Sequence, residues 1–110
     1  MIVASERRPL PAISLAEVLA TSDLPGGVAN ILTGITAELA PWLASHRDVD
    51  AIDLTGASEA ERPDLRRAAA DNLKRVRRPG DPDSDWTADP GLERITSFLE
   101  TKTVWHPVGL

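Results

Sequence analysis

Cysteine is absent from the 110-residue chain. Its absence excludes disulfide bonds, thiolate-ligated metal and a cysteine nucleophile. Long apolar runs are missing as well, since none approaches the roughly 20 residues that a membrane-spanning helix needs. The apolar stretch in the opening MIVASERRP is too short for a signal peptide. We therefore expect a cytoplasmic chain with no membrane partner.

Basic residues are in the minority, with 12 Lys and Arg against 17 Asp and Glu and a net charge of −5. Such a chain has little general affinity for nucleic acid or anionic membranes. One basic cluster stands out, but no aromatic residue interleaves it for base stacking. We interpret it as solvated surface and expect no nucleic-acid partner. Its members are Arg66, Arg67, Lys74, Arg75, Arg77 and Arg78.

Histidine is scarce too, and neither His46 nor His106 has a third ligand at metal-binding spacing. No metal site is expected. No carboxylate pair or Ser/His arrangement stands out either, so the residues themselves do not indicate an enzyme of another chemistry.

Short β-branched runs alternate with segments of helical period along the first part of the chain. Strands are predicted at MIVAS, VANIL, AIDL and LKRVRRP, and helices at residues 10–21, 35–50 and 59–72. In the first helix Ser14 and Glu17 are expected to form a capping box. In the second, Trp42 is expected to pack in the core or against another helix. This alternation indicates βαβ units, which pair their strands in parallel.

Two longer segments, LPGGVANILTG (24–34) and HRDVDAIDLTGA (46–57), are similar in residues and spacing to the cofactor-binding domain of the aldehyde dehydrogenase superfamily. IVASE resembles that family's first strand and its Lys-Pro-Ser-Glu-like loop, and LKRV resembles the start of its LKRVxLELGG strand. LETKTVW (99–105) resembles its C-terminal strand. The resemblance covers nearly the whole chain and implies an oxidoreductase family by descent.

The predicted fold class is α/β, a small parallel sheet of Rossmann-like βαβ units with a C-terminal helix and strand. Residues 1–78 form a partial nucleotide-binding-like domain. Residues 79–91, PGDPDSDWTADPG, form a linker or loop rich in Pro, Asp and Gly. Residues 92–110 are expected to form a helix and then a strand in TKTVWH.

The resemblance also shows which catalytic roles are vacant. The family attacks an aldehyde with a thiolate and activates water with the glutamate of LELGG, and this chain has no cysteine. LKRV continues into RRPGD, with Arg77 and Arg78 where the acidic strand should run. The linker at 79–91 stands where the family has its catalytic domain. We therefore expect no catalytic residue and an aldehyde dehydrogenase-like pseudoenzyme.

The turn TGAS, at residues 55–58, follows a predicted strand and precedes a helix, which is a geometry that can hold a phosphate. Where the family reads GSTxxG, this chain has Ala57 in place of the hydroxyl and Glu61 in place of the second glycine. The family's ribose-binding lysine falls at Val3, whereas a serine and a glutamate still match. Retained NAD(P) binding is expected to be weak, with Ser5, Glu6, Gly56 and Ala57 as the candidate cofactor-binding residues.

We favour a simpler interpretation, in which Gly34 and Gly56 only form tight strand-to-helix turns. The resemblance further implies that the C-terminal strand joins subunits, and a lone strand leaves its backbone groups unpaired. We expect a homodimer with Trp105 as its anchor, or assembly with a full-length aldehyde dehydrogenase family subunit. The alternative is a weak NAD(P)-binding module.

Overall fold

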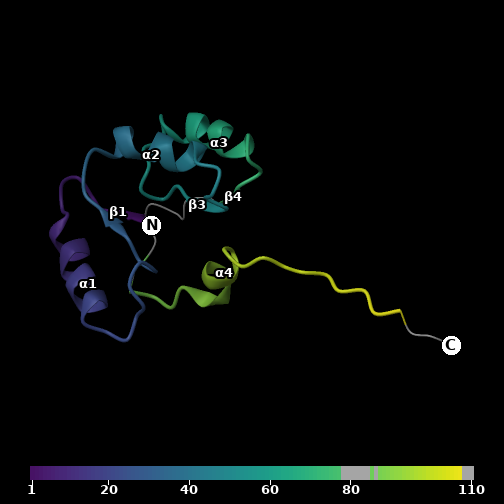
Figure 1. Ribbon diagram of the computed structural model, residues 1–110. Coiled ribbons are helices and arrows are strands. Elements are labelled where there is room, and N and C mark those ends of the chain that lie inside the picture. The colour runs from purple at the N-terminus through teal and green to yellow at the C-terminus, as the bar shows by residue number, and fades with distance from the viewer. Residues whose placement is uncertain (78–84, 86, 108–110) are drawn as a thin grey trace. The chain divides into compact units, whose positions relative to one another are not determined.

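The computed structural model describes residues 1–77, 85 and 87–107. The chain divides into two compact units, Met1–Gly80 and Asp81–Leu110. Within the described residues the first unit holds three helices and four short strands (Figure 1). The helices are α1 (Leu10–Ala20), α2 (Thr36–Ser45) and α3 (Arg62–Ala70), and the strands are β1 (Ile2–Val3), β2 (Ile31–Leu32), β3 (Ala51–Asp53) and β4 (Arg75–Arg77).

The strands pair in parallel, as βαβ units require. β1 pairs with β2 in the register Ile2↔Ile31, and α1 lies between them in the chain. β3 pairs with β4 in the register Ala51↔Arg75, and α3 forms their crossover. The predicted α/β class is confirmed. The four strands form two two-stranded sheets, because strands of two or three residues offer few backbone groups for further pairing.

Proline sets where α1 begins. Its N-cap is Pro9 and a second proline lies in its first turn, which a helix tolerates because those N–H groups have no intrahelical acceptor. Ser14 and Glu17 consequently lie inside the helix, and the capping box predicted for them is wrong. Thr21 closes the other end by donating its hydroxyl to the carbonyl of Glu17 at 3.0 Å.

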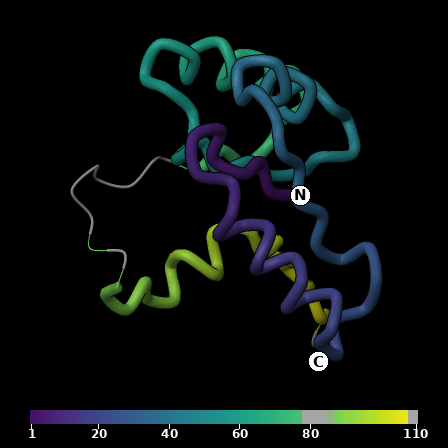
Figure 2. The backbone as a smooth tube through the Cα atoms, turned by 90° about the vertical axis from the view of Figure 1, so that its left-hand side faces the viewer, coloured from purple at the N-terminus to yellow at the C-terminus, as the bar shows by residue number. Residues whose placement is uncertain are grey.

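The core of the first unit lies between α2, α3 and β3. Small residues let the two helices lie side by side above β3 and β4 (Figures 1 and 2). The partly buried side chains of Ile52 on β3, Ala68 on α3 and Val76 on β4 pack against this centre. The core cluster is formed by Ala40, Ala44, Leu54, Ala57 and Leu65.

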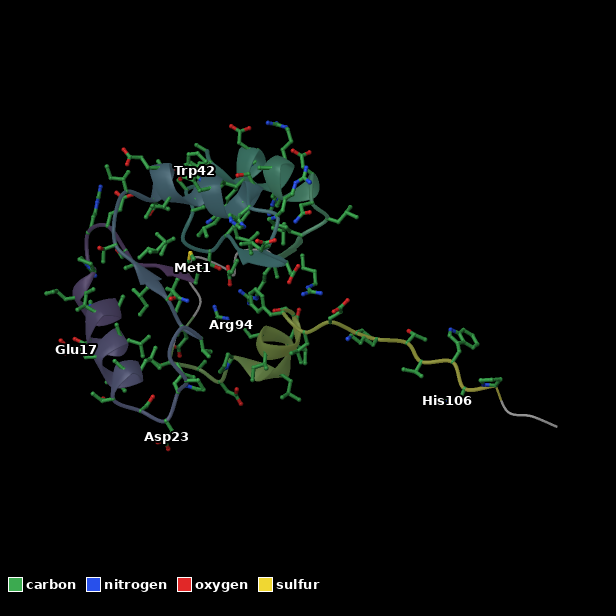
Figure 3. The ribbon with its side chains drawn as sticks, viewed as in Figure 1. Met1, Glu17, Asp23, Trp42, Arg94 and His106 are labelled. Atoms are coloured by element: carbon green, nitrogen blue, oxygen red, sulfur yellow. The ribbon has the colours of Figure 1, made fainter. Side chains whose placement is uncertain are left out.

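Trp42 does not take part in this core. Its side chain is 76% exposed on α2 (Figure 3), so the predicted packing is wrong. An α-helix turns by roughly 100° per residue. Ala40 and Ala44 face the core, and Trp42 is two residues from each, so it lies on the opposite face.

The second unit contains one described helix, α4 (Gly91–Thr96). Its start is held by an Asx-type turn in which the amide of Gly91 donates to Oδ1 of Asp89 at 2.9 Å. Residues 101–107 have neither helix nor strand. The strand expected in TKTVWH is therefore not formed. Among the described residues, no strand pairs with this segment. Most of the predicted linker, residues 79–84 and 86, lies outside the described part.

Among the described residues, no helix combines the length and the apolar character needed to cross a bilayer.

Candidate cofactor-binding site

Two of the candidate residues follow the carboxyl end of β1. The Ser5 hydroxyl accepts a hydrogen bond from the amide of Arg8 at 3.3 Å. The carboxylate of Glu6 accepts a hydrogen bond from the amide of Thr36, the first residue of α2. The N-cap position of α2 is Ile35, which has no side-chain cap of its own. Glu6 therefore caps α2 from another loop, at the end where the helix dipole favours negative charge.

Val3, where the resemblance places a ribose-binding lysine, is the last residue of β1 and is half-buried. Its aliphatic side chain has no hydrogen-bond donor. The ribose side of the candidate site therefore offers Ser5 and Glu6 alone, and one oxygen of Glu6 is already bonded to the backbone.

The other two candidates lie in the turn after β3. Ala57 donates its amide to the carbonyl of Leu54 at 3.1 Å, and its methyl group belongs to the buried core cluster. Its carbonyl accepts from Nε of Arg62 at 3.1 Å. The side chain that replaces the family's hydroxyl is thus packed inward. Among the described residues, no hydrogen bond or ion pair joins this turn to Ser5 or Glu6, and β1 and β3 belong to different sheets.

Of the two strand-to-helix turns, only one has a position that requires glycine. Gly34 has a φ of +153°, and a Cβ there would meet Cδ1 of Leu39 at 3.1 Å. Glycine is therefore required at that position, as predicted. Gly56 has no positive φ, and a Cβ there would meet nothing within 4 Å. A tight turn does not explain Gly56.

Glu61 reaches back into the turn and closes it. Its Oε2 accepts from the amide of Ser58 at 3.0 Å and from the Ser58 hydroxyl at 2.5 Å. In return, the amide of Glu61 donates to Oγ of Ser58 at 3.3 Å. This reciprocal pair has the hydrogen bonds of a capping box and closes the turn before α3, whose own N-cap position is Glu61. The hydrogen bond from the Ser58 side chain, followed by that from its amide, lowers the pKa of Glu61 below the usual 4.5.

A second polar cluster, which was not predicted from the sequence, lies where β3 ends. Asp53 and Arg77 are register partners on β3 and β4, and Arg77 Nη1 lies 3.0 Å from Asp53 Oδ2. The amide of Thr55 donates to Oδ1 of Asp53 at 2.8 Å. Partial burial acts to raise the pKa of Asp53, but the Thr55 hydrogen bonds and Arg77 outweigh it, so this pKa is lowered.

The parallel register was the signal that could have revealed this pair. Once Ala51 is aligned with Arg75, Asp53 and Arg77 face each other two residues further along. Choosing that register needs the three-dimensional structure, because strands of three residues fit more than one alignment.

The basic cluster is not one solvated surface. Lys74 is buried, with 7% of its surface exposed, and its ammonium group donates to the carbonyl of His46, the C-cap of α2. Asn72 donates to the next carbonyl, that of Arg47, at 2.7 Å. Arg77 is paired with Asp53, whereas Arg67 forms an exposed ion pair with Asp64 at 2.6 Å. The interpretation as solvated surface is wrong for Lys74, whose charge stabilises a helix end.

His46 has a structural role at the C-terminal end of α2. His46 Nδ1 accepts from the amide of Asp48 at 3.2 Å, at the C-terminal end of α2. Over residues 1–77, 85 and 87–107, no three His, Cys, Asp or Glu side chains are grouped so as to hold a metal ion.

Comparison with known proteins identifies the family to which the chain belongs. The sequence pattern of the aldehyde dehydrogenase family matches residues 1–78. The chain belongs to the aldehyde dehydrogenase family. The predicted resemblance is thereby confirmed for these residues. The resemblance of residues 99–105 lies outside the match and stays a prediction.

Two curated relatives show how much of the family this chain represents. It is 42% identical over 72 residues to the NADP/NAD-dependent aldehyde dehydrogenase PuuC of Escherichia coli strain K12. It is 38% identical over 72 residues to aldehyde dehydrogenase family 2 member C4 of Arabidopsis thaliana. Each alignment covers 66% of this chain and 14% of the relative. The chain therefore spans a small part of the length of these enzymes. No solved structure matches it.

Proposed function

We propose that this chain is a non-catalytic aldehyde dehydrogenase family protein that acts by assembling with a second copy of itself or with a full-length family subunit. The composition of its core carries the proposal. In the described residues, the buried hydrophobic side chains are five alanines and two leucines, and no large side chain is fully buried. Alanine removes little apolar area from water, so this core contributes little stabilisation.

The surface of α1 supports the same proposal. No residue of this helix is buried, although most of its 11 residues are apolar. Exposed apolar side chains lie along it at Leu10, Ile13, Leu15 and Val18. A helix that is apolar on all sides is normally covered by protein.

The missing catalytic groups support a role without aldehyde oxidation. The reaction of the family, as the resemblance implies it, needs a thiolate nucleophile, and the sequence contains no cysteine. No other group of the described residues replaces it, because the polar cluster at the end of β3 consists of an ion pair and a threonine. The carboxylate of Asp53 is already neutralised by Arg77.

The C-terminal segment is our candidate for joining subunits. Val104 and Trp105 are strongly exposed, the tryptophan at 89%. A segment rich in β-branched and aromatic residues forms a strand when a neighbouring strand supplies hydrogen-bond partners. Pairing with a second copy of residues 99–107 would provide these partners and cover both side chains.

The nicotinamide dinucleotide that the family implies does not fit the residues present. Val3 offers no donor for a ribose, and the Glu6 carboxylate and the Ser58 amide are bonded within the chain. Weak NAD(P) binding is the second candidate function. The observation that favours it is Gly56, for which neither backbone conformation nor packing requires glycine.

Light scattering and an activity assay on the intact chain test the proposal. We expect the mass of a dimer, and no reduction of NAD or NADP in the presence of a short aliphatic aldehyde. A folded monomer that also fails to bind a purified full-length family subunit would contradict assembly. Cofactor reduction that persists through repurification would contradict the absence of catalysis.

A further inference from the structure

We infer that Glu61 occupies the anion-binding position at the start of α3, so that its own carboxylate keeps phosphate groups, including those of dinucleotides, out of the turn between β3 and α3. The inference does not depend on the proposed assembly, because it rests on the hydrogen bonds of this turn alone. It assigns to Glu61 the blocking of this turn, beside the changes at Val3 and Ala57.

The start of a helix attracts anions because its first amides lack intrahelical acceptors and its dipole is positive there. In the turn before α3, the amides of Ala57, Ser58, Glu61 and Arg62 already have acceptors. The amide of Ala57 donates to Leu54 O at 3.1 Å, that of Ser58 to Glu61 Oε2 at 3.0 Å, and that of Arg62 to Ser58 O at 3.2 Å. The amide of Glu61 donates to Ser58 as well.

The Ser58 amide is the donor most relevant to phosphate binding, because its acceptor is a carboxylate and not a carbonyl group. A carboxylate at the start of a helix offers the negative charge and the acceptor oxygens that a phosphate would offer. Glu61 is tethered three residues away from Ser58, so its effective concentration at the turn is on the order of millimolar or higher. An incoming phosphate must displace it and also overcome its repulsion.

The positive charges next to the turn are engaged elsewhere. Arg62 directs its Nε to the carbonyl of Ala57 at 3.1 Å. Arg77 directs its Nη1 to Asp53 at 3.0 Å. Both nitrogens therefore point to these acceptors and not toward an anion at the Ser58 amide. The turn therefore has the backbone of a phosphate site, while its strongest donor is bonded to the chain's own carboxylate.

Glu59 provides a matched control in the same turn. It is exposed, and within the described part of the chain its side chain forms no hydrogen bond or ion pair. Replacing Glu59 removes the same charge from nearly the same place but leaves the Ser58–Glu61 pair intact. A comparison of the two positions separates occupation of the Ser58 amide from a general effect of net charge.

The test is calorimetric titration of NAD, NADP and inorganic pyrophosphate into the full chain. We expect the natural sequence to bind these ligands with dissociation constants in the millimolar range or weaker. Glu61→Gly and Glu61→Ala are expected to bind pyrophosphate or dinucleotide at least tenfold more tightly than Glu59→Gly and Glu59→Ala do. Glu61→Gln keeps an acceptor for the Ser58 amide and loses the charge, so we expect a smaller gain, of about threefold.

Each outcome decides the inference. Micromolar binding to the natural sequence would overturn it, as would equal gains at positions 59 and 61. Circular dichroism checks that each variant is folded. If neither Glu61→Gly nor Glu61→Ala folds, Glu61→Gln decides, because glutamine also completes a capping box. An unchanged affinity in that folded variant would then refute the role of Glu61.

Discussion

The ammonium group of Lys74 is hydrogen-bonded to the carbonyl oxygen of His46, which joins the residue before β4 to the C-cap of α2. The contact spans 28 positions in sequence and is made by a buried side chain. Together with the bond from Asn72 to Arg47, it fixes the end of α2 against the turn that follows α3. In a unit with a small core, such polar contacts account for a larger share of the stability.

Replacing Lys74 tests this contact. Lys74→Met keeps the aliphatic part of the side chain and removes the ammonium group's hydrogen bond to the carbonyl of His46, which retains a second donor, the amide of Val49 at 3.2 Å. A hydrogen bond made by a charged group contributes about 1.5–3 kcal/mol. We expect the free energy of unfolding, measured in urea, to fall by this amount. Arg67→Met is the matched control, because it removes an exposed ion pair worth about 0–1 kcal/mol. Equal losses in the two variants would show that the Lys74 contact is not stabilising.

The ion pair between Asp53 and Arg77 predicts how stability depends on pH. The pKa of Asp53 is lower in the folded chain than its ordinary value of 3.8, so folding favours the ionised carboxylate. This contribution is complete above pH 3.8 and disappears as the pH falls through the lower folded-state pKa. Asp53→Asn removes the titrating group. We expect the variant to lose less of its remaining stability on acidification than the natural sequence does.

Denaturation in urea at a series of pH values below neutrality measures this difference. Asp23→Asn serves as a control, because Asp23 lies in the exposed turn after α1. If both variants lost stability on acidification in parallel with the natural chain, the ion pair between Asp53 and Arg77 would make no contribution to the loss of stability at low pH.

Leu73 has an unfavourable backbone conformation that glycine would relieve. Its φ is +52°, in the left-handed region, which is costly for residues with a Cβ. Its side chain is 92% exposed, so it contributes little packing within the chain. We expect Leu73→Gly to raise the free energy of unfolding by about 0.5–1 kcal/mol. Ala70→Gly, at the end of α3, is expected to lower it. A decrease in both variants would contradict the relief of strain at Leu73.

The sequence predicted the elements of the first unit well, because hydrophobic period and turn residues are local signals. The capping box shows where such signals fail. The Ser-x-x-Glu pattern occurs at Ser14–Glu17 and again at Ser58–Glu61, and only the second pair forms a box. Proline decides between them, because Pro9 and Pro11 start α1 before Ser14, whereas Pro63 lies in the first turn of α3.

Non-local contacts were harder to predict. Lysine is rarely buried, so the role of Lys74 follows only once α2 and the turn after α3 are known to be neighbours. The terminal segment has the composition of a strand, but no strand forms there, since composition does not supply a hydrogen-bonding partner. For the same reason the candidate cofactor residues could be named from sequence, whereas the closure of their turn by Glu61 could not.

The last prediction concerns that terminal segment. If residues 99–107 pair with a second copy, Trp105 becomes buried at the centre of the interface, where tryptophan contributes most to binding. Trp105→Ser is then expected to shift the mass measured by light scattering from dimer to monomer at the same concentration. Trp42→Ser is the matched control, since Trp42 is likewise exposed but lies on the outer face of α2. A dimer that survives Trp105→Ser, or dissociates equally in Trp42→Ser, would show that the terminal segment does not hold the subunits together.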